Sequence, residues 1–373
     1  MNRRENMYPL KCHPSVFVIG DCYDILILTE ENSLVCLNVG GKNYYEENSG
    51  VLSSEKKRTR IKVPASVLDS AGSYTVTVRK SIERKAYFSE MGDPVSINYA
   101  FRPVKREGEI KIYFLSDVHA KYESALRAAS YYKDATDLYI LGGDITEAES
   151  VETIEIVASF CSDLARGETP IVFVRGNHDT RGKLAELYTD YFPAVGKHTF
   201  YTFRTGFING IVLDLGEDKP DSCPEYTAPL PDVYGGTNIF SDFRDREDDF
   251  IDSLKPAPDG SLTLAITHIP PAYSTSKPGT VFDIERERYA EWSRKLDSLG
   301  VSVMLSGHYH KTFVLEADDE RNTAEHSYPI IIGACHEGGF TGSAITLTTE
   351  GIDVAFTDEN RDTHGTYSYK FKR

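Results

Sequence analysis

The stretch that decides the fold is IKIYFLSDVH, residues 110–119, in which a run of apolar residues ends abruptly in polar ones. The same pattern returns in LYILGGD (138–144) and in PIVFVRGNHD (170–179). Segments with helical spacing follow the first two runs, over residues 124–132 and 150–165. Nearly continuous apolar strands that alternate with helices are typical of a parallel sheet covered on both faces. We therefore predict an α/β fold for this part of the chain.

The strand-and-helix pattern continues towards the C-terminus. Another apolar strand, SLTLAITH (261–268), precedes a predicted helix over residues 286–299 and a strand in VSVMLSGHYH (301–310). Residues 217–241 are irregular and polar, and we predict no element there. The last apolar runs, up to about residue 357, are typical of antiparallel strands.

The first hundred residues have a different character. Residues 15–100 consist of short alternating or β-branched runs separated by turn-forming residues. Six or seven strands at that spacing predict an immunoglobulin-like or fibronectin-like β-sandwich. We predict an N-terminal β-sandwich domain over residues 1–103, an α/β domain over residues 108–360 and a C-terminal tail over residues 361–373. The first domain carries no cluster of catalytic residue types, which favours a packing or spacer role.

Composition and charge exclude several classes of protein. A chain of 373 residues exceeds what one hydrophobic core usually supports, so about two domains are expected. The formal net charge of −16 argues against a nucleic-acid-binding surface. Six cysteines without regular spacing indicate neither a disulfide framework nor a zinc-thiolate site, and they favour a reducing, cytoplasmic location. The sequence contains no apolar run long enough to span a membrane, so we expect no membrane association.

Polar residues of one chemical kind follow the apolar strands of the α/β domain. All are types that bind metal ions: Asp117, His119, Asp144, Asn177, His268, His308 and His310. Carboxylate, imidazole and amide groups together suit divalent ions such as Mn, Fe, Zn or Ni. Ligands of open α/β sheets bind at the carboxyl ends of the strands. Separately, each residue could be a helix cap or a surface histidine, but five such strand ends in one domain favour a common metal site.

The spacing of these residues strengthens the metal hypothesis. Asp117 and His119 are two residues apart, so in an extended chain their side chains point to the same side and can bind one ion. His308 and His310 repeat this spacing. Glycines precede several of the candidate ligands, where the backbone must turn tightly beside the metals: Gly142, Gly143, Gly176 and Gly307.

Together these residues resemble the signature of the calcineurin-like metallophosphoesterases. The motifs that carry the resemblance occur in the family's order: Asp117-x-His119, Gly143-Asp144, Gly176-Asn177-His178-Asp179, His268 and Gly307-His308-x-His310. The resemblance covers about residues 110–357 and implies a four-layer α/β/β/α sandwich that holds two metal ions about 3.5 Å apart. With the β-rich segment in front, the layout is similar to that of purple acid phosphatases.

The resemblance also implies a role for each residue. The first ion would be held by Asp117, His119, Asp144 and His310, and the second by Asp144, Asn177, His268 and His308, with Asp144 as the bridge. Two cations that share a water lower its pKa, so that hydroxide can attack phosphorus in line. His178 resembles the family's histidine that assists the leaving group as a general acid, and we expect Asp179 to orient its ring.

One position departs from the purple acid phosphatases. Those enzymes carry a tyrosine three residues after the bridging aspartate, where it binds ferric iron, and this chain has Glu147 there. The resemblance to the wider family therefore implies a pair of divalent transition-metal ions, Mn, Fe, Zn or Ni. Arg175 and Arg181 flank the Asn177-His178 motif and are candidates for phosphate binding, although a surface salt bridge explains either one equally well.

The sequence predicts a dinuclear metal-dependent phosphohydrolase whose partner is a small phosphoester. The similarity of residues 177–181 to phosphodiesterase-like members favours phosphodiesters slightly, and we expect activity on phosphomonoesters as well. The alternative is a non-catalytic scaffold or interaction protein on the same fold, which would lack metal ligands, whereas every ligand position here is filled. A nuclease is disfavoured by the acidic charge and by the absence of a basic, aromatic-lined groove from the sequence.

Overall fold

The computed structural model describes residues 7–221, 237–258, 261–280, 283–334 and 339–371. The larger sheet has nine strands in the order β22-β21-β20-β11-β12-β13-β1-β2-β7. Strands β11, β12 and β13 are mutually parallel, and β1 runs parallel to β13. The strands of this sheet are β1 (Ser15–Ile19), β2 (Cys22–Leu28), β7 (Arg58–Pro64), β11 (Ile110–Leu115), β12 (Leu138–Gly142), β13 (Ile171–Val174), β20 (Thr341–Leu347), β21 (Gly351–Asp358) and β22 (Thr363–Lys370).

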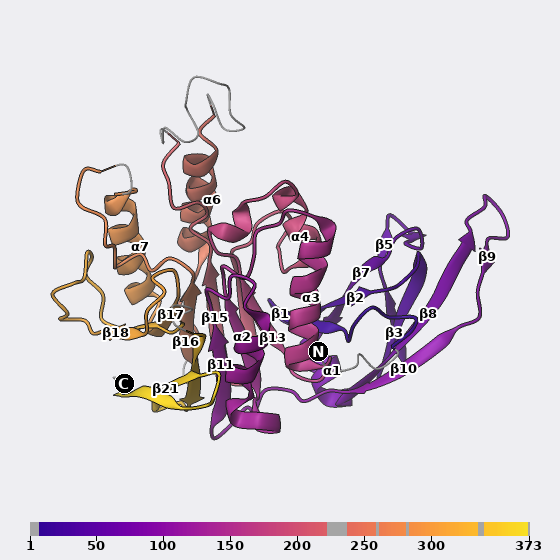
Figure 1. The fold of residues 1–373 in the computed structure, drawn as a ribbon, viewed down its shortest axis with the longest axis horizontal. Coiled ribbons are helices and arrows are strands. Elements are labelled where there is room, and N and C mark those ends of the chain that lie inside the picture. Colours follow the sequence, from indigo (N-terminus) through magenta and orange to yellow (C-terminus); the bar gives the residue numbers. More distant parts are fainter. Residues whose placement is uncertain (1–6, 222–236, 259–260, 281–282, 335–338, 372–373) are drawn as a thin grey trace.

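A second, six-stranded sheet has the order β14-β15-β16-β17-β19-β18. Strands β15, β16, β17 and β19 are parallel. Its strands are β14 (Tyr201–Thr205), β15 (Ile208–Leu213), β16 (Leu262–Thr267), β17 (Val301–Ser306), β18 (Phe313–Leu315) and β19 (Ile330–Ile332). Side chains from the inner strands of both sheets form one shared hydrophobic core, so the two sheets pack face to face (Figure 1).

Helices cover the outer faces of the two sheets (Figure 1). Alternation along β11 sends Ile112 and Phe114 into the core between the sheets, and Tyr113 and Leu115 into a second core on the other face. That second core contains residues of α2 (Tyr122–Ala129), α3 (Val151–Ala165) and α4 (Tyr188–Tyr191). A third core joins the six-stranded sheet to α6 (Ile239–Ser253) and α7 (Arg286–Ser298). Short 3-10 helices are η1 (Ser130–Ala135), η2 (His178–Thr180) and η3 (Ala185–Leu187).

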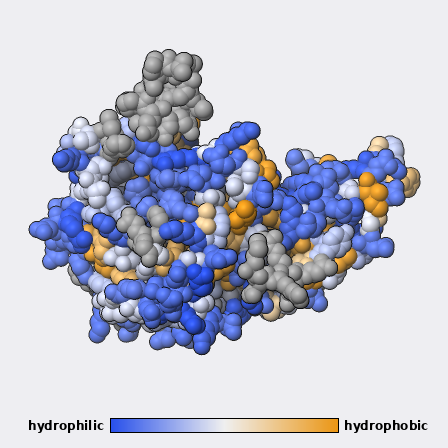
Figure 2. Space-filling model, in the orientation of Figure 1, coloured by the Kyte–Doolittle hydropathy of each residue, from blue (hydrophilic) through white to orange (hydrophobic). Residues whose placement is uncertain are grey.

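The remaining N-terminal strands form a smaller sheet in the order β10-β8-β3-β4, with β9 paired to β8. The ribbon of β8 and β9 projects away from the rest of the molecule (Figure 1). These elements are β3 (Ser33–Val39), β4 (Lys42–Tyr45), β8 (Ser73–Glu83), β9 (Glu90–Met91) and β10 (Val95–Ala100), and near them lie β5 (Glu47–Asn48), β6 (Val51–Leu52) and α1 (Ala65–Ala71). The face of the molecule in Figure 2 is mostly hydrophilic, with several separate apolar areas, one of which lies on the projecting ribbon.

The predicted helices over residues 124–132, 150–165 and 286–299 correspond to α2 with η1, α3 and α7. Helix α3 begins where the sequence suggests, because Ser150 and Thr153 form a reciprocal capping box. Helix α6 was not predicted. It begins inside the polar stretch 217–241, and two of its four buried residues, Arg244 and Glu247, are charged, so its buried face does not look apolar in the sequence. None of the helices in the described residues is long and apolar enough to cross a membrane.

The N-terminal strands are divided among different sheets. Strands β1, β2 and β7 continue the nine-stranded sheet beyond β13, β3, β4, β8, β9 and β10 form the smaller sheet, and β5 pairs with β6. Side chains of the smaller sheet belong to the same hydrophobic core as β11, β12 and β13. The larger sheet therefore includes strands from the segment 1–103, for which a domain of its own was predicted; the division into domains stays a prediction.

The C-terminal end also differs from the prediction of a tail over residues 361–373. Most of that segment is β22, which pairs with β21 and forms one edge of the nine-stranded sheet. Its side chains alternate between exposed and half-buried, so the strand lacks the apolar run by which the other strands were recognised.

Replacement of Phe17 tests this shared sheet. Phe17 in β1 is fully buried and its ring lies 5.9 Å from that of Phe173 and 6.1 Å from that of Phe192, both in the α/β part. We expect Phe17→Ala to lower the free energy of unfolding by about 3–5 kcal/mol in chemical denaturation. The matched change Phe88→Ala, at a ring that is 97% exposed, should have an effect of less than about 0.5 kcal/mol. Equal effects of the two variants would contradict the shared core.

Candidate metal centre

The predicted ligands lie where the parallel strands of the two sheets end. Asp117 and His119 follow β11, while Asp144 and Asn177 follow β12 and β13. On the opposite sheet, His268 follows β16, and both His308 and His310 follow β17. Because the two sheets pack face to face, their carboxyl edges bring these side chains together. In the described residues, three groups of possible ligands have atoms within 4.8 Å of one another: Asp117 with His119 and His310, Asp144 with His268 and His308, and His119 with Glu147 and His178. The first two groups consist of predicted ligands.

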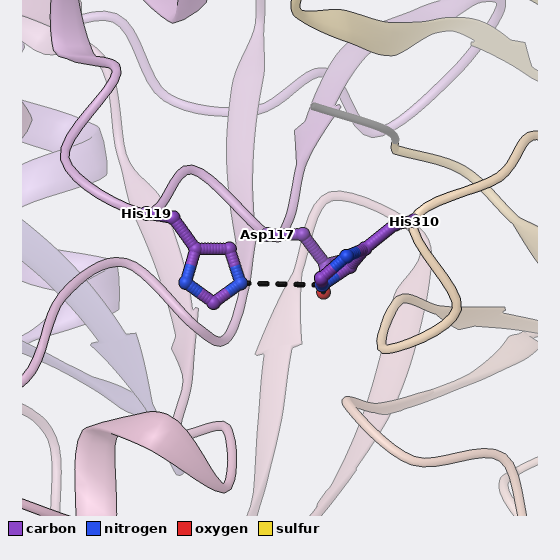
Figure 3. Close-up of side chains that lie close together, drawn as sticks. All are labelled: Asp117, His119 and His310. Carbon is purple, nitrogen blue, oxygen red and sulfur yellow. Dashed lines mark hydrogen bonds and ion pairs between the residues drawn. The ribbon is translucent and has the colours of Figure 1, made fainter. Parts of the chain in front are cut away.

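The first group faces a common point between the loops after β11 and β17 (Figure 3). The Nε2 atoms of His119 and His310 are 3.2 Å apart, and His310 Nε2 lies 3.3 Å from Asp117 Oδ1. His119 Nε2 is also 3.8 Å from Asp144 Oδ2. Asp117, His119 and His310 therefore lie within reach of one ion, and Asp144, the fourth residue predicted for the first ion, lies next to His119.

The second group meets the first at Asp144. Asp144 Oδ2, which faces His119, also lies 3.1 Å from His268 Nε2. His308 Nδ1 is 3.1 Å from Asn177 Oδ1, so the predicted amide ligand joins this group as well. The two predicted ligand sets are thus adjacent, and Asp144 contacts members of both.

The backbone at this site is strained. Five of the seven predicted ligands adopt positive φ angles: Asp117 (53°), His119 (42°), Asp144 (54°), His308 (73°) and His310 (50°). Residues other than glycine rarely adopt this conformation, and each such residue costs about 1 kcal/mol or more unless the surroundings enforce it. This concentration of left-handed residues at the strand ends turns the side chains towards one point, as expected for a functional site.

Glycine is needed where two of these loops touch. A Cβ atom on Gly176 would overlap the Asp144 carboxylate, and one on Gly307 would lie 2.6 Å from Asp117 Oδ2. Any side chain at either position would therefore push a predicted ligand out of place. The interpretation of both glycines as positions of close backbone approach agrees with these contacts.

Asp179 connects the loops that carry the ligands. Its fully buried carboxylate accepts hydrogen bonds from four backbone N–H groups, those of Asp144 (2.9 Å), Ile145 (3.1 Å), Thr146 (3.3 Å) and Gly176 (2.8 Å). The expectation that Asp179 orients the ring of His178 is therefore wrong. Asp179 instead fixes the backbone from which Asp144 projects, so it is a positioning residue, and its burial keeps it from touching a substrate.

His178 is held by Glu147, a contact that the sequence did not predict. His178 Nδ1 lies 2.9 Å from Glu147 Oε1, and the opposite ring nitrogen, Nε2, lies 3.2 Å from Arg181 Nη1. A carboxylate only accepts hydrogen bonds, so His178 donates from Nδ1. The ring of His178 also lies edge-on to His119, with centroids 4.8 Å apart. The only signal for Glu147 in the sequence was its place three residues after Asp144. That position did not indicate that its side chain contacts His178.

The two arginine candidates have different surroundings. Arg175 Nε donates to Asp214 Oδ2 at 2.7 Å, and the guanidinium lies over the ring of Phe243. Arg175 therefore forms a largely buried ion pair with Asp214 and is not directed to a phosphate site. Arg181 contacts His178 and also pairs with Glu217 (2.6 Å) and with Asp218 (2.9 Å), so it lies beside the centre with most of its charge balanced.

The charges within this cluster favour a cation beside the two buried carboxylates. Burial alone would lower the pKa of His268, but the nearby Asp144 and Asp117 carboxylates raise this pKa to about 10. Burial opposes ionisation of Asp144, yet the positive charge of His268 and its hydrogen bond hold the pKa of Asp144 below its ordinary value. The buried carboxylates therefore retain positive charge next to them, here as a proton on His268.

The orientation of His268 fits a metal ligand. Its Nδ1 lies 2.8 Å from the carbonyl oxygen of Gly142, which can only accept a hydrogen bond, so Nδ1 carries a hydrogen. In the neutral ring, Nε2 then presents a lone pair to the Asp144 carboxylate 3.1 Å away. Two lone pairs at this distance in a buried site need a proton or a metal ion between them. A backbone acceptor that fixes the tautomer of a ligating histidine is usual at metal sites.

Comparison with known proteins agrees with this geometry. The sequence profile of the calcineurin-like phosphoesterase family matches residues 110–312, more than half of the chain. The chain therefore belongs to this family, as its motifs indicated. It is 23% identical over 241 residues to the Bacillus subtilis (strain 168) protein YpbG, an alignment that covers 64% of this chain and 76% of YpbG.

Two solved structures share the fold over nearly the whole chain. A purple acid phosphatase from yellow lupin (Lupinus luteus) seeds superposes with a TM-score of 0.60 at 8% identity, over 96% of this chain and 74% of the phosphatase. PhoD superposes with a TM-score of 0.59 at 12% identity, over 99% of this chain and 91% of PhoD. At such low identities the superpositions establish the mixed α/β metallophosphoesterase fold and no more.

Metal binding should release a proton from His268. The metal-free protein is expected to hold that proton up to about pH 10, whereas a metal ion requires the neutral ring. Titration of metal-free protein with Mn²⁺ or Zn²⁺ in two buffers of different ionisation enthalpy should therefore show uptake of proton by the buffer at pH 8. Apparent affinity should increase as the pH rises towards 10. His268→Gln should abolish this release, and an unchanged release in that variant would contradict the assignment.

Proposed function

We propose that the chain is a dinuclear metal-dependent phosphohydrolase that cleaves small phosphoesters. The observation that carries the proposal is the convergence of two adjacent ligand groups on Asp144. Asp117, His119, Asp144 and His310 would hold one ion, and Asp144, Asn177, His268 and His308 the other. Divalent ions at these places would supply a water of lowered pKa and positive charge for the phosphate oxygens.

His178 is the proposed general acid. Because Glu147 engages Nδ1, the ring nitrogen left for the departing oxygen is Nε2. In the structure Nε2 accepts from Arg181 Nη1 at 3.2 Å, because a guanidinium only donates. Arg181 would therefore have to turn to the phosphate before Nε2 could take up a proton and act as the acid.

The charges around the centre support a preference for phosphodiesters. A diester carries one negative charge at neutral pH and a monoester close to two. Arg175 is directed to Asp214, and Arg181 is balanced by Glu217 and Asp218, so little positive charge beyond the ions remains to attract a dianion. We therefore propose that diesters are preferred slightly and that monoesters are hydrolysed as well.

The proposal also includes the layering of the α/β part, the packing of the N-terminal strands and the cellular location of the protein. The three hydrophobic cores support an α/β/β/α layering of the α/β part. The N-terminal strands belong partly to the nine-stranded sheet and partly to the smaller sheet, and the common core of these sheets supports a sandwich-like packing of the N-terminal segment. A reducing, cytoplasmic environment is supported by the free thiols of Cys12, Cys22, Cys36 and Cys161. Of the six cysteines, Cys223 and Cys335 lie outside the described residues.

Asp144→Asn tests the dinuclear centre. Protein loaded with Mn²⁺, Zn²⁺, Fe²⁺ or Ni²⁺ should contain close to two ions per chain by elemental analysis, and chelation should abolish hydrolysis of a panel of phosphodiesters and phosphomonoesters. The neutral amide weakens both ion sites at once, so Asp144→Asn should lose most of the metal and at least about 10²-fold in kcat. Full activity of stripped protein, or of this variant, would refute the proposed function.

His178→Ala separates acid catalysis from metal binding. The variant should retain both ions and lose about 10²-fold in kcat with alkyl leaving groups, because these need a proton to depart. The loss should be much smaller with a nitrophenyl leaving group, which departs as a stable anion. Glu147→Gln, which keeps the size of the side chain, should give a weaker defect of the same kind. Equal losses for good and poor leaving groups would remove His178 from the acid role.

A further inference from the structure

A cavity of about 250 Å³ opens beside the metal centre. Its walls come from the loop after β16 (residues 269–276), from the start of α7 and from the loop after β17. His308, a predicted ligand of the second ion, forms part of its lining, as does Asp218, which pairs with Arg181. A phosphoester whose phosphate lay at the metals could therefore extend its organic group into this cavity.

Aromatic rings dominate the apolar part of the wall. Tyr273, Tyr289 and Tyr309 line the cavity together with Pro270 and Pro271. The rings of Tyr273 and Tyr309 meet edge to face, with centroids 4.6 Å apart, and Tyr309 Oη donates to the backbone oxygen of Tyr273 at 2.9 Å. This hydrogen bond and the ring packing fix the aromatic wall in advance, so a ligand need not order it. Such walls favour flat rings, which gain from edge-to-face or offset contacts.

The charged groups of the wall are balanced within the protein. Arg286 pairs with Asp283 at 2.7 Å, and Asp218 pairs with Arg181 at 2.9 Å. An additional charge on the ligand would therefore find little compensation here, while the hydroxyls of Ser274, Thr275 and Thr323 offer hydrogen bonds. The cavity suits an uncharged group that combines a flat ring with a few polar atoms.

We propose that this cavity binds the ring-bearing alcohol portion of the substrate, an aryl or nucleoside group, and so selects ring-bearing phosphoesters over alkyl ones. This inference rests on the proposed phosphoesterase function and adds the class of its substrate. At about 250 Å³ the cavity is smaller than sites for drug-sized ligands, which fits one ring system rather than an extended chain.

Three methyl phosphodiesters with comparable leaving groups test the selection: benzyl methyl phosphate, adenosine 5′-(methyl phosphate) and butyl methyl phosphate. Metal-loaded wild-type protein should show a kcat/KM at least about tenfold higher for a ring-bearing ester than for the butyl ester, and the two ring-bearing esters distinguish an aryl from a nucleoside site. Tyr273→Ala should reduce this ratio to near one. The control Tyr45→Ala, at a half-exposed tyrosine of β4, should leave the ratio unchanged.

Binding of the free alcohols gives a readout that does not depend on hydrolysis. In calorimetry with metal-loaded protein, benzyl alcohol or adenosine should bind and 1-butanol should not, and Tyr273→Ala should abolish binding. Thr323→Trp, which fills the cavity from another wall, should also abolish binding of the ring alcohols. This second variant provides the test if Tyr273→Ala does not fold.

The two measurements distinguish the two proposals. Binding of a ring alcohol without hydrolysis of any phosphoester would refute the proposed function and leave the cavity assignment standing. Hydrolysis without preference among the three esters, together with no binding of either ring alcohol, would refute the cavity assignment alone.

Discussion

The burial of two carboxylates beside each other is the constraint on which the rest of this structure depends. Asp117 and Asp144 are both 0–1% exposed and belong to neighbouring loops. Two adjacent negative charges without water are strongly unfavourable unless positive charge lies between them. In the metal-free protein the proton on His268 provides part of that charge, and bound divalent ions would provide more. The same feature that makes the cluster unstable by itself makes it a strong site for cations.

The scaffold holds this unfavourable arrangement in place by several independent means. The carboxyl edges of two packed sheets bring the side chains together, and the hydrogen bonds to Asp179 join the loops after β12 and β13. Gly176 and Gly307 allow the loops to touch where a side chain would not fit. The left-handed backbone at Asp117, Asp144 and the neighbouring histidines is tolerated because these contacts enforce it. Strain at the centre is thus offset by ordinary packing in the three surrounding cores.

The N-terminal segment contributes to the same scaffold, although none of the predicted ligands lies in it. Through β1 it covers what would otherwise be an open edge at β13, the strand that leads to Asn177 and His178. An uncovered edge strand exposes unpaired backbone groups and invites aggregation. The β-rich segment therefore has a structural task within the α/β part, in addition to any function of its projecting ribbon.

The sequence alone indicated which residues lie together at the candidate centre, because each predicted ligand follows an apolar strand, and parallel strands that end at one edge bring such residues together whatever the details of packing. It likewise indicated the helices α2, α3 and α7, whose buried faces are mostly apolar, but not the short helices α1 and α4. The tertiary structure decided the contacts that depend on side-chain direction across distant segments: Glu147 rather than Asp179 on the ring of His178, Arg175 turned to Asp214, and helix α6 with its buried charges. It also decided that β1, β2 and β7 join the larger sheet. A strand's residue pattern shows that its two faces differ in burial, but its partner in the sheet is chosen by long-range packing, which local sequence does not record.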